Sequence, residues 1–79
     1  MSDLNPLFIR SCTMLWGQRW QSEAGRALGI SDRHIRRLAA GQAAVTPGMI
    51  TELHQLADEH LRQLQATVND LAVAKNRAV

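Results

Sequence analysis

Hydrophobic residues recur at helical spacing in four segments of this chain, and Gly and Pro residues separate the segments. The pattern predicts helices over about residues 6–16, 20–28, 32–40 and 48–75. Ala, Leu, Arg and Gln are frequent while β-branched residues are few, and this mixture favours helix over strand. We therefore expect an all-α fold of four helices with a long C-terminal helix.

Three of the predicted helices begin at residues that are typical of helix caps. Asn5-Pro6 and Thr46-Pro47 each place a capping side chain before a Pro, which is favoured in the first turn of a helix. Ser31 is a third N-cap candidate, and Asp32 follows it where a negative charge suits the helix dipole. We expect all three side chains to cap their helices.

The second and third predicted helices have the spacing of a helix-turn-helix. Ala24 and Gly25 are small enough for two helices to cross closely, and Gly29 suits a turn that needs a positive φ. Four apolar residues lie at offsets that would hold the two helices together: Leu28, Ile30, Ile35 and Leu38. We therefore predict a four-helix DNA-binding domain with a helix-turn-helix over residues 20–41.

Three Arg residues share one face of the third predicted helix. At about 100° per residue, this Arg face (Arg33, Arg36 and Arg37) lies opposite the apolar face that Ile35 and Leu38 define. Such residues ordinarily form a solvated face, but here they lie on the second helix of the motif, which is the helix that enters the major groove. We therefore expect the Arg face to contact double-stranded DNA.

The formal net charge is only +2, but the charges are unevenly distributed. Residues 1–45 contain six Arg and three acidic residues, whereas residues 46–79 contain three basic and four acidic residues. The first part therefore suits an anionic partner, and Arg suits bidentate contacts to phosphate or guanine. We expect Arg19, in the loop before the second helix, to contact phosphate and His34 to flank the Arg face.

The last predicted helix carries two apolar sets. The first set lies close to the other helices and should complete their core: Met49, Ile50, Leu53, Leu56 and Ala57. The second set, which we call the seam, recurs at the spacing of a coiled coil: Leu61, Leu64, Val68 and Leu71. Because the first set would fill a core of this size, we expect the seam to form a dimer interface with a second copy. Two alternatives remain open, in which the chain folds back or the helix breaks near His60 and the seam packs on the first helix.

The chain therefore divides into two parts. Residues 1–45 are expected to form a three-helix DNA-binding region, and residues 46–79 a long helix that completes the core and mediates dimerisation. A homodimer would present two recognition helices to half-sites about 34 Å apart on one face of the duplex. An alternative function is a small protein-interaction module, an adaptor or an antitoxin, whose last helix grips a partner protein through the seam.

The stretch from Trp16 to Gly41, beginning Trp16-Gly17-Gln18-Arg19-Trp20-Gln21, resembles the helix-turn-helix of small phage and bacterial regulators of the lambda-repressor/Cro-like class. This class includes anti-CRISPR-associated repressors, and the resemblance covers roughly residues 16–50. It implies a transcriptional repressor with a phosphate contact from Gln21. It also implies contacts to DNA bases and to the DNA backbone from five residues: Ser31, Asp32, Arg33, Arg36 and Arg37. Gly25 stands where these proteins usually have Ala, so the first helix of the motif should be weaker by up to about 1 kcal/mol.

No residue pattern points to an enzyme or to a bound cofactor, small molecule or metal. There is no Gly-rich phosphate loop and no pairing of a nucleophile with a base. His54 and His60 lie on different helix faces, and no Cys joins them as a metal ligand. We expect Cys12 to be a packed thiol, and a single Cys without a signal pattern or a transmembrane span fits the cytoplasm.

Overall fold

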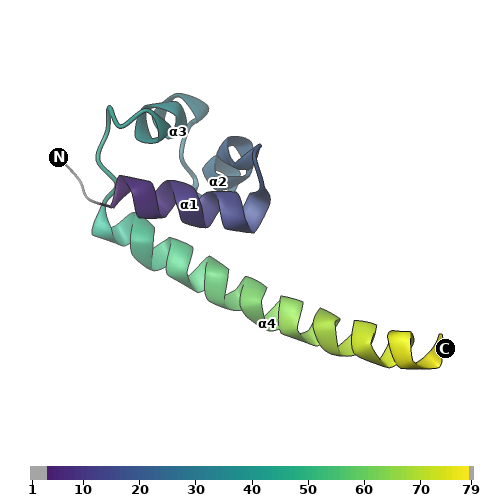
Figure 1. Cartoon of the computed structure of the whole chain (residues 1–79). Coiled ribbons are helices and arrows are strands. Elements are labelled where there is room, and N and C mark those ends of the chain that lie inside the picture. The colour runs from purple at the N-terminus through teal and green to yellow at the C-terminus, as the bar shows by residue number, and fades with distance from the viewer. Residues whose placement is uncertain (1–3, 79) are drawn as a thin grey trace.

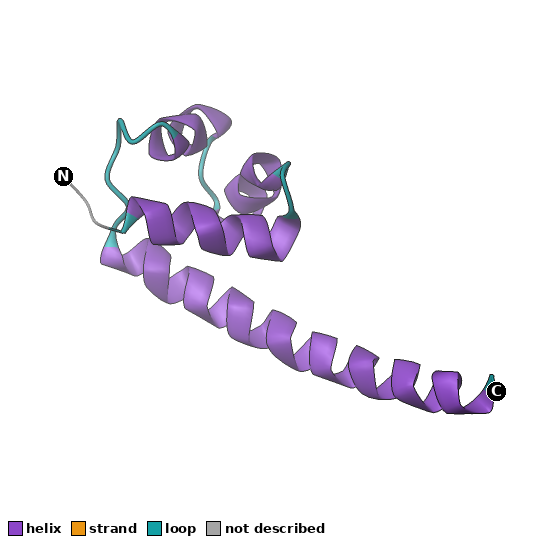
Figure 2. Ribbon diagram, in the orientation of Figure 1, coloured by secondary structure: helices purple, strands orange, loops and turns teal. Residues whose placement is uncertain are grey.

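The protein consists of helices joined by short connections (Figures 1 and 2). This computed structural model describes residues 4–78, and within this range there are four α-helices and no strand. The helices are α1 (Asn5–Trp16), α2 (Trp20–Leu28), α3 (Asp32–Ala39) and α4 (Pro47–Arg77). The all-α prediction is confirmed, and every helix begins and ends within two residues of the position that the pattern predicts.

The core lies where the first three helices meet the start of α4. Its buried apolar residues come from every helix and from the α3–α4 connection: Phe8, Cys12, Trp20, Ala24, Ile35, Leu38, Val45 and Leu53. The rings of Phe8 and Trp20 meet edge to face, with centroids 6.0 Å apart and an interplanar angle of 80°. This arrangement places the positive edge of one ring against the negative face of the other. The aromatic pair therefore joins α1 to α2.

Two of the three predicted caps are confirmed, and the third is wrong. The hydroxyl oxygen of Ser31 accepts from the backbone N–H of His34, and that of Thr46 from the N–H of Met49, each at 3.2 Å. At α1 the residue in the N-cap position is Leu4, and no side chain caps the helix. Asn5 lies instead inside the first turn, where its side chain is buried.

The Asn5 amide holds the α3–α4 connection against α1. Its Nδ2 donates to the carbonyl oxygens of Leu38, at 3.0 Å, and Ala43, at 2.8 Å. Its Oδ1 accepts from the backbone N–H of Val45 at 3.0 Å. A buried amide is stable only when its polar atoms are paired, and here one side chain pairs with three backbone groups far away in sequence. The sequence pattern missed this role because Asn before Pro is also what a helix cap requires.

The two halves of α4 differ in burial. The first half contributes Leu53 to the core, Met49 and Ile50 pack against that core, and Leu56 and Ala57 are partly buried. From residue 59 to residue 78 every residue is exposed, and the second half of the helix projects away from the other three helices (Figure 1). The molecule accordingly extends 53 Å along one axis and about 20 Å along the others.

Neither of the alternatives for the seam is present within residues 4–78. The helix passes through His60 without a break, and the chain does not fold back. Leu61, Leu64, Val68 and Leu71 are each between 49% and 63% exposed. The seam is therefore an apolar surface that the described part of the chain leaves uncovered. None of the helices in this part combines the length and the apolar character that crossing a membrane requires.

Candidate nucleic-acid interface

The crossing of α2 and α3 depends on a glycine. A Cβ atom added at Gly25 would lie 2.8 Å from the carbonyl oxygen of Ile30 and 3.5 Å from Cγ1 of Ile35. A contact of 2.8 Å with a backbone atom is too short for any side chain. The sequence interpretation treated Gly25 as a weaker substitute for Ala, but in this chain the absence of a Cβ is what allows the turn to pass so close to α2.

The turn between α2 and α3 has the predicted backbone conformation. Gly29 has φ 68° and ψ 34°, in the left-handed region that side chains with a Cβ rarely adopt. The backbone N–H of Ile30 then donates to the carbonyl oxygen of Gly25 at 2.8 Å. The positive φ at Gly29 thus ends α2 and redirects the chain, and two residues later Ser31 caps α3.

The inner face of α3 fixes the direction of its outer face. Ile35 and Leu38 are completely buried, whereas Arg33, Arg36 and Arg37 are exposed. Spacings of three and four residues make these Arg side chains neighbours on the helix surface. Neither of the two ion pairs found within residues 4–78 includes them. The three guanidinium groups therefore retain their hydrogen-bond donors for an external ligand.

Hydrogen bonds at the end of α3 keep the helix regular through Arg37, the last residue of the Arg face. The N–H of Gln42 donates to the carbonyl oxygen of Arg37 at 2.8 Å, and the N–H of Gly41 to that of Leu38 at 3.2 Å. This pair of bonds forms a Schellman motif, which satisfies carbonyl groups that the helix would otherwise leave unpaired. With the Asn5 bond to the carbonyl oxygen of Leu38, it holds the last turn of α3 in place.

The other predicted contact residues lie at the starts of α2 and α3. Arg19 precedes the first residue of α2, Gln21 lies in its first turn, and both are exposed. Ser31 and Asp32 are exposed at the start of α3, and His34 is partly buried at its flank. The Ser31 oxygen that accepts from His34 still carries a hydroxyl hydrogen that can be donated. The charges at this surface are thus mixed, with one carboxylate beside the Arg face.

The position of α3 leaves this surface open. Within the described residues, the backbone of α3 lies close to the backbones of α1 and α2 and farther from that of α4. Figure 1 shows α3 on the side of α1 that faces away from α4. The Arg face and the seam are therefore separate surfaces, and a ligand on one does not cover the other.

Other chemistry in the described residues is limited. Residues 4–78 contain no group of three or more His, Cys, Asp or Glu side chains that could hold a metal ion. Cys12 is completely buried, and this burial raises the pKa of its thiol to about 11. Arg26 and Glu23 approach to 3.7 Å in an exposed pair on α2. A pair of this kind contributes little to stability.

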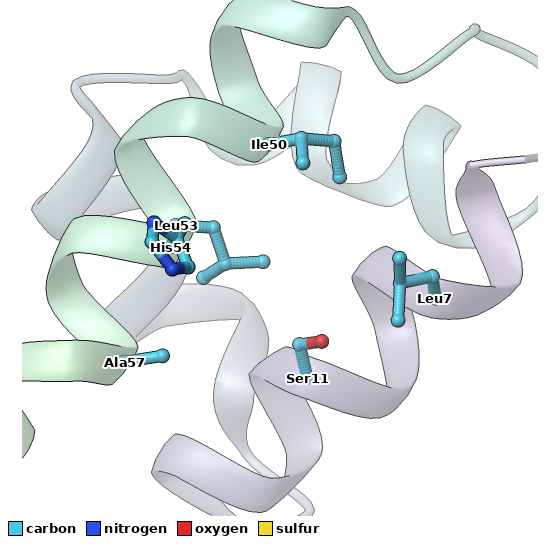
Figure 3. Close-up of a pocket in the computed structure, with 6 residues that line it drawn as sticks. All are labelled: Leu7, Ser11, Ile50, Leu53, His54 and Ala57. Carbon is cyan, nitrogen blue, oxygen red and sulfur yellow. The ribbon is translucent and has the colours of Figure 1, made fainter. Parts of the chain in front are cut away.

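An apolar groove lies between α1 and α4. Figure 3 shows Leu7 and Ser11 of α1 facing Ile50, Leu53, His54 and Ala57 of α4 across it. The groove continues toward the seam along a second set of residues: Arg10, Ser11, Met14, Leu15, Ala57, His60, Leu61 and Leu64. Nothing in the sequence pattern indicated this groove, because it depends on how α1 lies against α4.

Comparisons with protein-family models, with curated proteins and with solved structures found no match to this chain.

Proposed function

We propose that the protein binds double-stranded DNA in the major groove, as a helix-turn-helix formed by α2 and α3. The Arg face carries this proposal, because it presents three unpaired guanidinium groups on the exposed side of a helix that is held firmly from behind. Arg is the residue that most often reads guanine, through paired hydrogen bonds to O6 and N7. A helix in the major groove can bring such side chains to base edges and to phosphates together.

The remaining predicted contacts fit the same orientation. Arg19 and Gln21 at the start of α2 would contact phosphate groups, and such contacts position a protein without reading sequence. Ser31 would donate to phosphate or to a base. Asp32 repels phosphate but can accept from the amino group of cytosine, so it would favour particular sequences. His34 would contribute at the edge of the interface.

The biological role that we propose is transcriptional repression by a homodimer that recognises an inverted repeat, as in phage and prophage-type operons. The resemblance of residues 16–50 to lambda-repressor/Cro-like regulators supports this role. The exposed seam supports the homodimer, because a second copy of the chain would cover it. A homodimer also matches an inverted repeat, which has two half-sites.

Selection of binding sites from random DNA, followed by titration of the selected duplex, tests the proposal. The triple variant Arg33→Ala, Arg36→Ala, Arg37→Ala should weaken binding by at least about 100-fold, since each bidentate contact contributes about 1–3 kcal/mol. The matched control is Arg26→Ala, Arg62→Ala, Arg77→Ala, which removes the same charge from exposed positions elsewhere and should cost much less. Equal losses in the two triple variants would show that only overall charge matters, and full affinity in the first would refute the proposal.

A protein-interaction module is the second candidate, and the uncovered seam is the observation that favours it. In that case α4 would grip a different protein, as an adaptor or antitoxin does, and the selection would enrich no DNA sequence. Light scattering separates the two, because a homodimer covers the seam without a foreign partner whereas a monomer leaves it exposed.

A further inference from the structure

The seam continues the face of α4 that α1 covers. Leu53 and Leu71 are 18 residues apart, which is five full turns of an α-helix, so they lie on one line along the helix. Leu53 is buried beneath α1, whereas Leu71 is 63% exposed. One apolar stripe therefore runs along α4, and α1 covers only its first half.

The α1–α4 groove and the seam form a continuous surface. Ala57 and Ser11 line both parts of the groove, and Leu61 and Leu64 belong to the groove and to the seam. Met14, on the α1 side, is 81% exposed, and Leu7 is 40% exposed. The seam and the groove thus offer one elongated and mainly apolar surface, whose lining also includes Arg10, His54 and His60.

We propose that this surface binds the second half of α4 from another copy of the chain, in antiparallel orientation. Leu61 of each copy would face Leu71 of the other, and Leu64 would face Val68 of the other. The last turns of each α4 would then lie in the α1–α4 groove of the other copy. The proposal concerns only how two copies of the chain pair, and its geometry does not depend on DNA binding.

The seam is suited to this pairing by its symmetry. Its spacings of 3, 4 and 3 are the same when they are counted from either end, with the midpoint at Ala66. Antiparallel pairing about that midpoint places every seam residue opposite another seam residue. The exposed side chains of the seam, with Met14 and Leu7, offer roughly 600 Å² per copy, and two copies reach the lower end of the range for specific interfaces.

The position of α1 opposes the parallel alternative. Paired helices lie about 8–10 Å apart, whereas a helix with its side chains is about 10–12 Å wide. In a parallel pair the two α1 helices would both have to fit between the first halves of the two α4 helices, at the same level. In the antiparallel pair each α1 meets only the end of the other copy's α4, which the groove beside α1 can receive.

The charges along α4 favour the same orientation. Residues 47–60 contain three acidic residues and no Lys or Arg, whereas residues 61–78 contain three basic residues and one acidic. Antiparallel pairing sets the basic end of one helix beside the acidic part of the other, with Lys75 near Asp58 of the second copy. Parallel pairing would set Lys75, which follows the seam on the same face, against Lys75. Like charges in such positions are destabilising.

Disulfide formation between single-cysteine variants tests the orientation, in the absence of DNA. Leu61→Cys and Leu71→Cys should each fail to cross-link when alone, because two copies of either residue would be about 15 Å apart along an antiparallel pair. A disulfide needs Cα atoms within about 7 Å. An equimolar mixture should give a disulfide-linked dimer that contains one copy of each variant, identified by mass. Cys12 is buried, so the unmodified chain provides the uncross-linked control.

Val68→Glu and Val73→Glu provide a matched pair that tests the surface itself. The two Val residues are 49% and 54% exposed on the same helix, but Val73 lies on the side away from the seam. Light scattering should show that Val68→Glu halves the particle mass while Val73→Glu leaves it unchanged. Cross-linking of either single-cysteine variant with itself, or a monomer at every concentration of the unmodified chain, would overturn the proposal. Full DNA affinity in the Arg triple variant with an unchanged dimer would refute the DNA-binding proposal and leave this inference intact, so the two proposals fail separately.

Discussion

Residues 4–58 and residues 59–78 use the same apolar residue types in different ways. In the first region Phe8, Ile35 and Leu38 are completely buried, and helices from distant parts of the chain cover one another. In the second region the Leu and Val residues of the seam share one face of α4, but every residue is exposed. A chain of this size forms too small a core to bury the apolar residues of both regions. Small domains often add a second subunit for that reason. The contrast shows that contacts within one copy bury the apolar residues of the first region and leave those of the second exposed.

The largest difference between the regions should appear when a buried and an exposed apolar side chain are shortened. Ile35→Ala removes atoms from a fully buried site and should lower the free energy of unfolding by about 3–4 kcal/mol. Val73→Ala is the control, because its side chain is exposed and faces away from both core and seam, and the change should be below about 0.5 kcal/mol. Urea denaturation followed by circular dichroism measures both. Similar losses in the two variants would remove the distinction between the regions.

Asn5 tests whether one side chain holds α3 in the first region. Asn5→Ala should lower the free energy of unfolding by about 2–3 kcal/mol, because it breaks three hydrogen bonds and leaves buried backbone groups unpaired. Asn5→Asp keeps the acceptor for Val45 but places a negative charge against two carbonyl oxygens, so it should not rescue stability. If Asn5→Asp were as stable as the unmodified chain, the hydrogen bonds from Asn5 Nδ2 to the carbonyl oxygens of Leu38 and Ala43 would contribute little to stability.

Glycine substitutions at two positions sharpen the comparison between tight packing and open surface. Gly25→Ala gains helix propensity but forces Cβ toward the carbonyl oxygen of Ile30, and we expect a net loss of about 1–2 kcal/mol. At Gly48 a Cβ would meet only Thr46 Oγ1, at 3.8 Å, so Gly48→Ala should be neutral or stabilising by up to about 1 kcal/mol. Thermal unfolding of both variants measures the difference. A stabilising Gly25→Ala would mean that the turn can move away from α2.

Cys12 offers the smallest test, through pH. Its pKa is about 11 in the folded chain and 9.0 without burial, so the unfolded chain loses its thiol proton first as pH rises. The free energy of unfolding should therefore fall between about pH 9 and pH 11, by about 1 kcal/mol at pH 10. The chain has no Tyr, so few other groups titrate there. Cys12→Ala is the control, and it should flatten this part of the pH profile.

Much of the molecule was predictable because its signals are local. Helix positions follow from apolar spacing, and the caps at Ser31 and Thr46 and the turn at Gly29 each depend on residues within a few positions of one another. The direction of the Arg face also follows from Ile35 and Leu38, since residues on one helix keep a fixed angular relation. The exposure of the seam was predictable from the number of apolar residues that a small core can hold.

Only the tertiary structure decided the roles of Asn5 and Gly25 and the presence of the α1–α4 groove. Asn5 bonds to groups 33 to 40 residues away, and no local pattern distinguishes that role from a helix cap. Gly25 is constrained by the path of the backbone at Ile30 rather than by its own helix. The groove exists because α1 covers one half of the apolar stripe on α4. The sequence by itself therefore determined which residues are helical and which face outward, whereas packing between distant segments determined which polar and small residues hold those faces in position.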